Sequence, residues 1–172
     1  MTQALGDRIL KVDHAGEHGA VNIYGAQTLV SCVTAPELTA TLREFIAHEQ
    51  RHRVLFWSRM QLRAVRRCRS YLLCGVAGYL LGFITGLLGR QAIAATTFAV
   101  ESVVLEHLEK QLFELKDSDP EAYATVLDIV EEEREHHDHG KRLMEAGRFW
   151  PSLITPVVRF STETVIWLGM RL

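Results

Sequence analysis

Two short motifs in this chain place a glutamate three residues before a histidine. They are Glu49-Gln50-Arg51-His52 and Glu133-Arg134-Glu135-His136, and each lies 32 residues after a further glutamate, Glu17 or Glu101. Positions i and i+3 share one face of a helix, so each motif presents a carboxylate and an imidazole side by side. Carboxylates can bridge two cations and imidazole suits iron, so this donor set is typical of a di-iron or di-manganese site.

The second motif lies within a run of acids and histidines that allows several pairings, residues 131–138. A single Glu-x-x-His motif in a glutamate-rich helix belongs more often to a solvent-exposed face than to a metal site. The spacing from the preceding glutamate selects Glu133 and His136 from this run. A ligating histidine usually donates its other N–H to a carboxylate or a carbonyl. Glu132 and Asp138 are therefore expected behind the ligands. His48 and His107 are expected to have either a structural role or a role in supporting the ligands, rather than to bind metal.

The two sets of candidate ligands belong to an internal repeat with a constant offset of 84 residues. Sliding residues 17–52 over residues 101–136 without a gap gives eight identities, where chance would give about two. The identical pairs are Glu17/Glu101, Gln27/Gln111, Pro36/Pro120, Glu37/Glu121, Ala40/Ala124, Thr41/Thr125, Glu49/Glu133 and His52/His136. Two similar helical hairpins packed antiparallel would bring four glutamates and two histidines together inside one bundle.

The elements that must position these residues are predicted to be helices, because proline is scarce and Ala, Leu, Val and Glu are frequent. Two helices are expected to open with one capping pattern, Thr34-Ala35-Pro36-Glu37 and Ser118-Asp119-Pro120-Glu121, in which Thr34 caps the first. The expected helices cover residues 6–31, 34–67, a stretch ending near Lys116, 118–147 with Pro151 as a stop signal, and 155–170. The prediction is an all-α, ferritin-like four-helix bundle in a single domain over residues 1–172, with an extra apolar helical segment and a C-terminal helix.

The extra apolar segment, residues 70–89, has no charged side chain over 20 residues, which is the length needed to span a bilayer. Its glycines fall along one helical face and permit close helix packing: Gly75, Gly78, Gly82, Gly86 and Gly89. An arginine-rich stretch precedes it, residues 43–69, and would attract anionic lipid headgroups. We expect the segment to lie in a membrane interface; a buried core or subunit interface is the second alternative, and a membrane-spanning helix is the third.

Composition excludes several classes of protein. The chain has 172 residues, 48% of them hydrophobic, with 21 acidic and 19 basic side chains. The near-neutral charge excludes a general nucleic-acid binder, and the hydrophobic content excludes a disordered chain. Its three cysteines, Cys32, Cys68 and Cys74, are odd in number and lack C-x-x-C spacing, so reduced thiols are expected. Charges in residues 1–11 argue against a secretory signal.

Several runs of the chain resemble the demethoxyubiquinone hydroxylase (Coq7/Cat5) family. The opening run is Val12-Asp13-His14-Ala15-Gly16-Glu17, followed by Ile23-Tyr24. The similarity continues nearly to the C-terminus, through residues 80–89, Ala99-Val100-Glu101, residues 133–138, Ile166-Trp167-Leu168 and Arg171-Leu172. The resemblance is therefore both specific and long.

The resemblance implies a ferritin-like di-iron monooxygenase that uses O2 to hydroxylate the ring of a polyprenylated demethoxyquinol in ubiquinone biosynthesis. It places Glu49 and Glu133 as bridges between the irons. The chain departs from the family at Leu108, where animal members carry tyrosine, and at residues 66–69, which replace a proline-containing link. The family's metal ligands fall on the six residues of the repeat: Glu17, Glu49, His52, Glu101, Glu133 and His136.

The partners implied are a polyprenyl quinone or quinol, an anionic membrane surface, a lipid-binding or biosynthetic-complex partner, and a second copy of the chain. Such an enzyme would sit peripherally on the cytoplasmic face of a bacterial inner membrane or the matrix face of the mitochondrial inner membrane. Two alternatives stay open. The first keeps the metals for ferroxidase, peroxidase or di-manganese catalase chemistry. The second is a non-enzymatic, membrane-associated helical adaptor whose Glu and His side chains are solvated.

Overall fold

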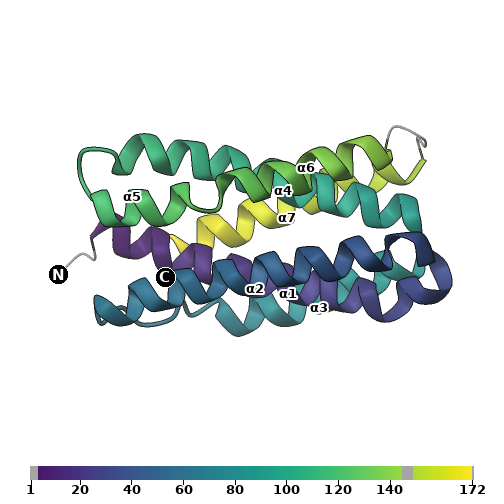
Figure 1. The fold of residues 1–172 in the computed structure, drawn as a ribbon, viewed down its shortest axis with the longest axis horizontal. Helices are drawn as coiled ribbons and strands as arrows, with labels where there is room; N and C mark the ends of the chain where they lie inside the picture. The colour runs from purple at the N-terminus through teal and green to yellow at the C-terminus, as the bar shows by residue number, and fades with distance from the viewer. Residues whose placement is uncertain (1–3, 145–148, 172) are drawn as a thin grey trace.

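The computed structural model describes residues 4–144 and 149–171, and all of its regular secondary structure is helical, which confirms the all-α prediction (Figure 1). One 3-10 turn, η1, joins the first two long helices. The helices run as follows: α1 Leu5–Thr34, η1 Pro36–Leu38, α2 Thr39–Leu62, α3 Tyr71–Leu87, α4 Arg90–Leu115, α5 Pro120–Leu127, α6 Val130–Met144 and α7 Phe149–Gly169.

The bundle consists of two helical hairpins, α1 with α2 and α4 with α5 and α6, which pack as in ferritin-like proteins. An outer helix covers each hairpin, because α3 packs along α1 and α7 packs along α4. Adding the offset of 84 to α3 places it on residues 155–171, which lie almost entirely within α7. The repeat therefore includes the outer helix of each half, α3 and α7, although sequence identity revealed it only over residues 17–52.

The junction before α2 differs from its prediction. Thr34 is the last residue of α1 rather than a cap, and its hydroxyl donates to the Gly86 carbonyl at 2.7 Å. Ala35 occupies the N-cap position of η1 without a side-chain hydrogen bond. In the second half, Asp119 rather than Ser118 caps the helix, because its carboxylate accepts from the Ala122 N–H at 3.1 Å. Asp119 holds the N-cap position because it directly precedes Pro120, the first residue of the helix, and Ser118 lies one residue too early.

Two further boundaries also differ from the prediction. α2 ends at Leu62 rather than residue 67, since Ala64 turns the chain with φ of 53° and Val65 is then buried. The helix predicted over residues 118–147 is interrupted between α5 and α6, where Ile129 is completely buried in the core. Its predicted end near residue 147 lies outside the described residues.

The C-terminal helix begins earlier than predicted. α7 starts at Phe149, so Pro151 lies in its first turn and does not act as a stop signal. Proline is tolerated at this position because the first N–H groups of a helix have no intrahelical acceptor.

The described residues contain three buried apolar clusters, and the two larger ones lie on either side of the six candidate ligands along the helices. One is built around Tyr24 and Phe45 and the other around Phe56 and Met60. Because the ligand positions fall between these clusters on α1 and α2, the carboxylates are enclosed by hydrocarbon at both ends. This enclosure gives the site a low dielectric constant and excludes bulk water.

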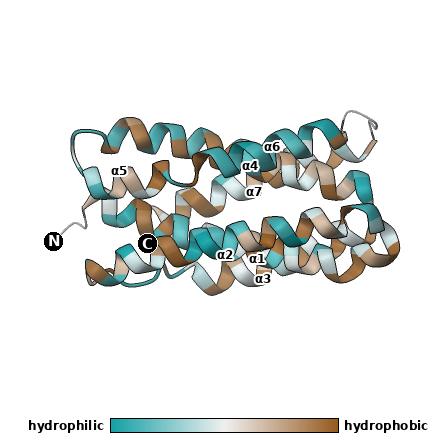
Figure 2. Cartoon of the chain, in the orientation of Figure 1, coloured by the Kyte–Doolittle hydropathy of each residue, from teal (hydrophilic) through white to brown (hydrophobic). Residues whose placement is uncertain are grey.

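The glycine face of α3 packs against α1 within the molecule. A Cβ atom on Gly78 or Gly82 would collide with the backbone of Gly19 or Ile23 on α1. The opposite face of α3 is exposed and apolar, and it carries Leu72, Leu73, Val76, Tyr79, Leu80, Phe83, Ile84 and Leu87. Figure 2 shows hydrophobic stretches along this helix. Among the described residues, no helix combines the length and hydrophobicity required to cross a bilayer.

Candidate metal centre

Four helices bring the six predicted ligands into one buried cluster. The structure places Glu17 on α1, Glu49 and His52 on α2, Glu101 on α4, and Glu133 and His136 on α6. Each of the six is at most 6% exposed. In the non-enzymatic adaptor hypothesis these Glu and His side chains would be solvated, so their burial argues against that hypothesis.

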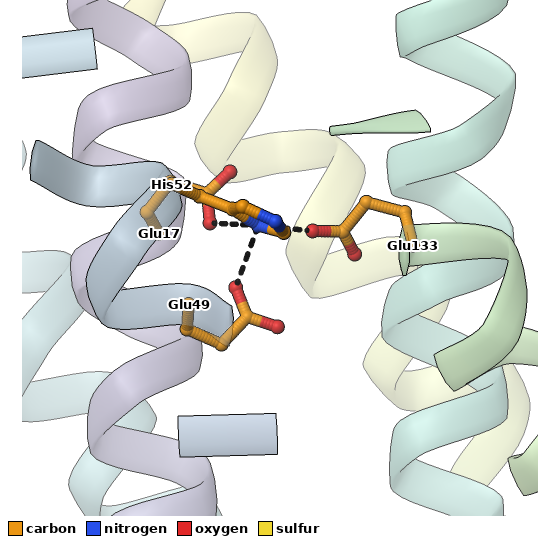
Figure 3. A group of neighbouring side chains, drawn as sticks. All are labelled: Glu17, Glu49, His52 and Glu133. Carbon is orange, nitrogen blue, oxygen red and sulfur yellow. Dashed lines mark ion pairs between the residues drawn. The ribbon is translucent and has the colours of Figure 1, made fainter. Parts of the chain in front are cut away.

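The ligand atoms form two overlapping groups. One contains Glu17, Glu49, His52 and Glu133 (Figure 3), and the other contains Glu49, Glu101, Glu133 and His136. Within each group one atom from every residue lies within 4.8 Å of the others. Glu49 and Glu133 are common to both groups, so each of these carboxylates could serve two cation positions.

Both histidines direct Nδ1 into the cluster. His52 Nδ1 lies 2.9 Å from Glu133 Oε1 and 3.4 Å from Glu17 Oε2. His136 Nδ1 lies 3.2 Å from Glu49 Oε1. Several of these facing atoms are buried without a hydrogen-bond partner, including both Nδ1 atoms. Buried polar atoms are normally satisfied, so these atoms fit a bound cation.

The electrostatics of the cluster depend on the distribution of protons. Burial and the Glu49 carboxylate raise the pKa of Glu17 well above its usual value, and burial with Glu133 does the same for Glu101. Burial alone would lower the pKa of His52, but the Glu133 and Glu17 carboxylates raise it to about 12. In the same way, Glu133 and Glu49 raise the pKa of His136 to about 10. Without metal, protons therefore balance the carboxylates.

Two divalent cations would balance four ionised carboxylates, charge for charge, and would displace these protons. Hard carboxylate oxygens and imidazole nitrogens are ligands that suit iron. The residues present thus fit a dinuclear centre.

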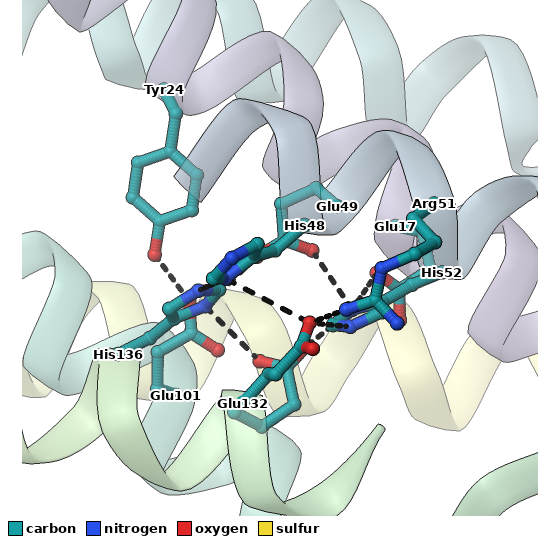
Figure 4. A network of polar contacts seen from close by, with 10 residues as sticks. Glu17, Tyr24, His48, Glu49, Arg51, His52, Glu101, Glu132 and His136 are labelled. Atoms are coloured by element: carbon teal, nitrogen blue, oxygen red, sulfur yellow. Dashed lines mark hydrogen bonds and ion pairs between the residues drawn. The ribbon is translucent and has the colours of Figure 1, made fainter. Parts of the chain in front are cut away.

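The groups behind the histidines differ between the two halves (Figure 4). His52 Nε2 lies 2.9 Å from Glu132 Oε2, and Arg51 forms an ion pair with the same carboxylate. His136 Nε2 lies 3.1 Å from His48 Nδ1. Glu132 and His48 therefore lie behind the candidate ligands. The sequence predicted this position for Glu132 and left a structural or a supporting role open for His48. Asp138, also predicted behind the ligands, does not lie there, because it pairs with His137 at the surface; the one residue between Asp138 and His136 turns it to another helical face.

Tyr24 is a site residue that the sequence analysis missed. Its side chain is 1% exposed and its hydroxyl donates to the Glu101 carboxylate. A signal was available, because Tyr24 follows Glu17 by two helical turns and so shares its face. The repeat pairs Tyr24 with Leu108, which has no hydroxyl.

A cavity of about 340 Å³ leads from the cluster toward the outer helices. Four of the candidate ligands line it at one end: Glu17, Glu49, Glu101 and Glu133. The remaining wall is mostly apolar and comes from α1, α3, α4 and α7, with His107 among its few polar residues. His107 therefore belongs to the cavity rather than to the ligand set. A cluster of this kind at the end of an apolar cavity can expose bound metal to an apolar molecule and shield it from water.

Comparison with known proteins identifies relatives along nearly the whole chain. A mitochondrial NADPH-dependent 3-demethoxyubiquinone 3-hydroxylase of Mus musculus is 37% identical, with 99% of this chain and 80% of that protein covered. The Homo sapiens protein of the same name is 36% identical, over 100% of this chain and 80% of its own. A 3-demethoxyubiquinol 3-hydroxylase of Rhodospirillum rubrum is 36% identical, over 98% of this chain and 79% of its own.

The family model described as ubiquinone biosynthesis protein COQ7 matches residues 4–169. This match covers all four ligand-bearing helices and both outer helices. The resemblance found in the opening motif therefore extends through the whole repeat, and the chain belongs to the COQ7 family of ubiquinone biosynthesis proteins.

Proposed function

We propose that this chain is a di-iron monooxygenase that hydroxylates the ring of a polyprenylated demethoxyquinol. The observation that carries the proposal is the pair of ligand groups sharing Glu49 and Glu133 at the inner end of an apolar cavity. The names of the mouse, human and bacterial relatives support the substrate class and the reaction.

In this proposal the six ligands divide between two iron ions. Glu17 and His52 would hold one ion, Glu101 and His136 would hold the other, and Glu49 and Glu133 would contribute to both. The irons would supply reductive activation of O2 and transfer of one oxygen atom to the ring. The protein would orient the ligands through Glu132, His48 and Tyr24 and would exclude water through the two apolar cores.

The substrate would reach the cavity from a membrane surface. The cavity wall includes Ala77 and Leu81 of α3 and Val165 and Ile166 of α7, and both helices expose apolar side chains on their outer faces. A polyprenyl tail would lie between these helices while the ring approaches the carboxylates. We therefore propose peripheral attachment to the membrane that contains the quinone, through α3 and α7 rather than through a spanning helix.

The arginines before α3 contribute less to this surface than their number suggests. Arg51 pairs with Glu132, and Arg63 pairs with Asp119 at 2.6 Å. Arg67 stacks over Trp57 with 4.4 Å between its guanidinium carbon and the ring centroid. These three side chains are engaged within the molecule, so apolar contact is expected to dominate membrane binding. Binding of the purified protein to anionic liposomes should therefore persist at moderate salt, and no binding at any salt concentration would contradict the attachment.

A single-turnover experiment tests the reaction. Protein loaded with Fe(II) and mixed anaerobically with demethoxyquinol is exposed to 18O2, and the product is analysed by mass spectrometry. We expect a hydroxylated ring that carries one 18O atom. Chemical reduction of the iron makes the result independent of the physiological electron donor.

The matched control is Glu133→Ala, which removes a bridging carboxylate and should give no product. If the wild type gives no hydroxylated ring but breaks down peroxide or oxidises iron rapidly, the result favours catalase or ferroxidase chemistry instead. If the purified wild-type protein cannot bind two iron ions per chain, the proposal of a dinuclear metal centre is itself wrong.

A further inference from the structure

One polar pair interrupts the apolar wall of the cavity. Gln111 Nε2 on α4 donates to Asp13 Oδ1 on α1 at 3.0 Å, and both residues line the cavity. Gln111 is 6% exposed. Neither residue belongs to the ligand groups, so metal binding does not explain their position.

Each member of the pair keeps an oxygen without a hydrogen-bond partner. These atoms are Asp13 Oδ2 and Gln111 Oε1, and both are buried. Burial raises the pKa of Asp13 to about 7 against the opposing effect of the Gln111 hydrogen bond, with a further rise from Glu133. A carboxyl group that is partly neutral near pH 7 can donate a hydrogen bond as well as accept one. The pair thus offers two adjacent polar positions inside an apolar cavity.

The position of the pair relates it to the metal centre. Asp13 precedes Glu17 by four residues on α1, so the two share a helical face and are separated by about 6 Å along the axis. A small ring that contacts Asp13 would therefore lie within reach of the carboxylate cluster, with its tail free to extend along the apolar wall.

The repeat supplies a comparison within the chain. Gln111 corresponds to Gln27, and Asp13 corresponds to Thr97. Gln27 is fully buried and donates to Thr85 Oγ1 on α3 at 3.0 Å. Its Oε1 atom is also unpartnered, but Gln27 does not line the cavity. An unpaired amide oxygen alone is therefore not distinctive. Gln111 differs from Gln27 because it lines the cavity and meets the carboxyl of Asp13, whose counterpart in the repeat is Thr97.

We propose that Asp13 and Gln111 form a polar clamp that binds an oxygen substituent of the quinol ring and so orients the ring toward the metal centre. This inference rests on the proposed function and assigns these residues a binding role. A ring hydroxyl can donate to Asp13 Oδ2 or Gln111 Oε1, and a ring oxygen can accept from the neutral Asp13 carboxyl. The ligand class is a quinol or quinone whose ring oxygens are free.

The test compares two ligands on the iron-loaded protein without O2: a short-tailed demethoxyquinol and its derivative with both ring hydroxyls methylated. Equilibrium binding should favour the free quinol about tenfold in the wild type, as expected for loss of one hydrogen bond to a buried polar group. Asp13→Leu and Gln111→Leu should each reduce this preference to within about twofold, through weaker binding of the quinol alone. Two variants on different helices guard against a folding failure in one of them.

Gln27→Leu is the matched control, because it removes the corresponding amide from the other half and should leave the preference unchanged. The clamp is overturned if Asp13→Leu and Gln111→Leu proteins that are folded and still bind two irons keep the full preference for the free quinol. The pair would then be only a structural contact between α1 and α4. Equal binding of both ligands by the wild type would also overturn the clamp. Failure of the proposed function is distinguishable, since the wild type would then give no hydroxylated ring in the single-turnover experiment.

Discussion

The two halves of this molecule supply the same candidate ligands but surround them differently. Glu17, Glu49 and His52 of the first half match Glu101, Glu133 and His136 of the second at every position. The groups that support them do not match. His48 corresponds to Glu132, and Tyr24 corresponds to Leu108.

These differences make the two proposed metal positions inequivalent. His52 lies against a carboxylate, Glu132, which increases the electron-donating strength of an imidazole ligand. His136 lies against the imidazole of His48, whose pKa is lowered by burial and by the proximity of His136. The Glu101 carboxylate accepts a hydrogen bond from Tyr24, whereas Glu17 Oε2 has no partner. The repeat thus preserves the donor set and varies the groups that tune each position.

The largest expected effect is on iron content, and it distinguishes residues common to both ligand groups from residues that belong to only one. Glu133→Ala removes a carboxylate common to both ligand groups, so we expect bound iron to fall from two ions per chain to nearly none. Glu17→Ala and Glu101→Ala should each keep about one ion. Iron analysis with circular dichroism checks this difference. Two ions retained in Glu133→Ala would contradict the bridging role.

The next effect tests the groups behind the histidines. Glu132→Gln should weaken one metal position about 10- to 100-fold, because the carboxylate no longer supports His52. His48→Gln should weaken the other position less, since an amide replaces a neutral partner. Titration with Fe(II) or Co(II), monitored spectroscopically, measures both. Equal losses in the two variants would show that the halves do not differ in this respect.

A smaller effect concerns the helix starts, where the halves also differ. Asp119 caps α5 and accepts two hydrogen bonds from Arg63, each 2.6 Å long, whereas Ala35 has no side-chain cap. Asp119→Ala should lower the free energy of unfolding by about 2 kcal/mol without changing metal content. Denaturant unfolding measures the loss, and Ser118→Ala is the control, with almost no expected change.

The same carboxylate predicts a dependence on pH. Hydrogen bonds from Arg63 lower the pKa of Asp119 in the folded state. The contribution of Asp119 is therefore fully present above the pKa of an unfolded aspartate and is lost as pH falls through the lower folded-state value. The difference in stability between wild type and Asp119→Ala should shrink on acidification; a constant difference would contradict the ion pair.

The smallest effect tests the tyrosine that one half lacks. Tyr24→Phe removes the donor to Glu101 and should weaken the adjacent metal position about fivefold, equivalent to about 1 kcal/mol. Leu108→Val, at the corresponding position, should leave both metal affinities unchanged. The same spectroscopic titration separates the two results. An unchanged affinity in Tyr24→Phe would remove this source of inequivalence.

Local patterns in the sequence were sufficient to predict the fold class and the six candidate ligands that the fold brings together. The i, i+3 spacing of Glu49 and His52 is a property of any helix, and the offset of 84 residues selected Glu133 and His136 from an ambiguous acidic run. The prediction of Glu132 behind a ligand followed from the needs of a ligating imidazole. Helix boundaries were predicted less well, because Ala35, Val65 and Ile129 respond to burial in the assembled bundle rather than to local propensity.

The sequence by itself thus determined an all-helical repeat and the six residues that could bind two metals, since both follow from periodicity and residue chemistry. Only the tertiary structure decided that Glu49 and Glu133 are shared between two ligand groups, that Tyr24 reaches Glu101, and that Asp13 meets Gln111 in the cavity. These contacts join residues from different helices. Their geometry depends on how the two halves pack, which the spacing of residues along a single helix does not specify.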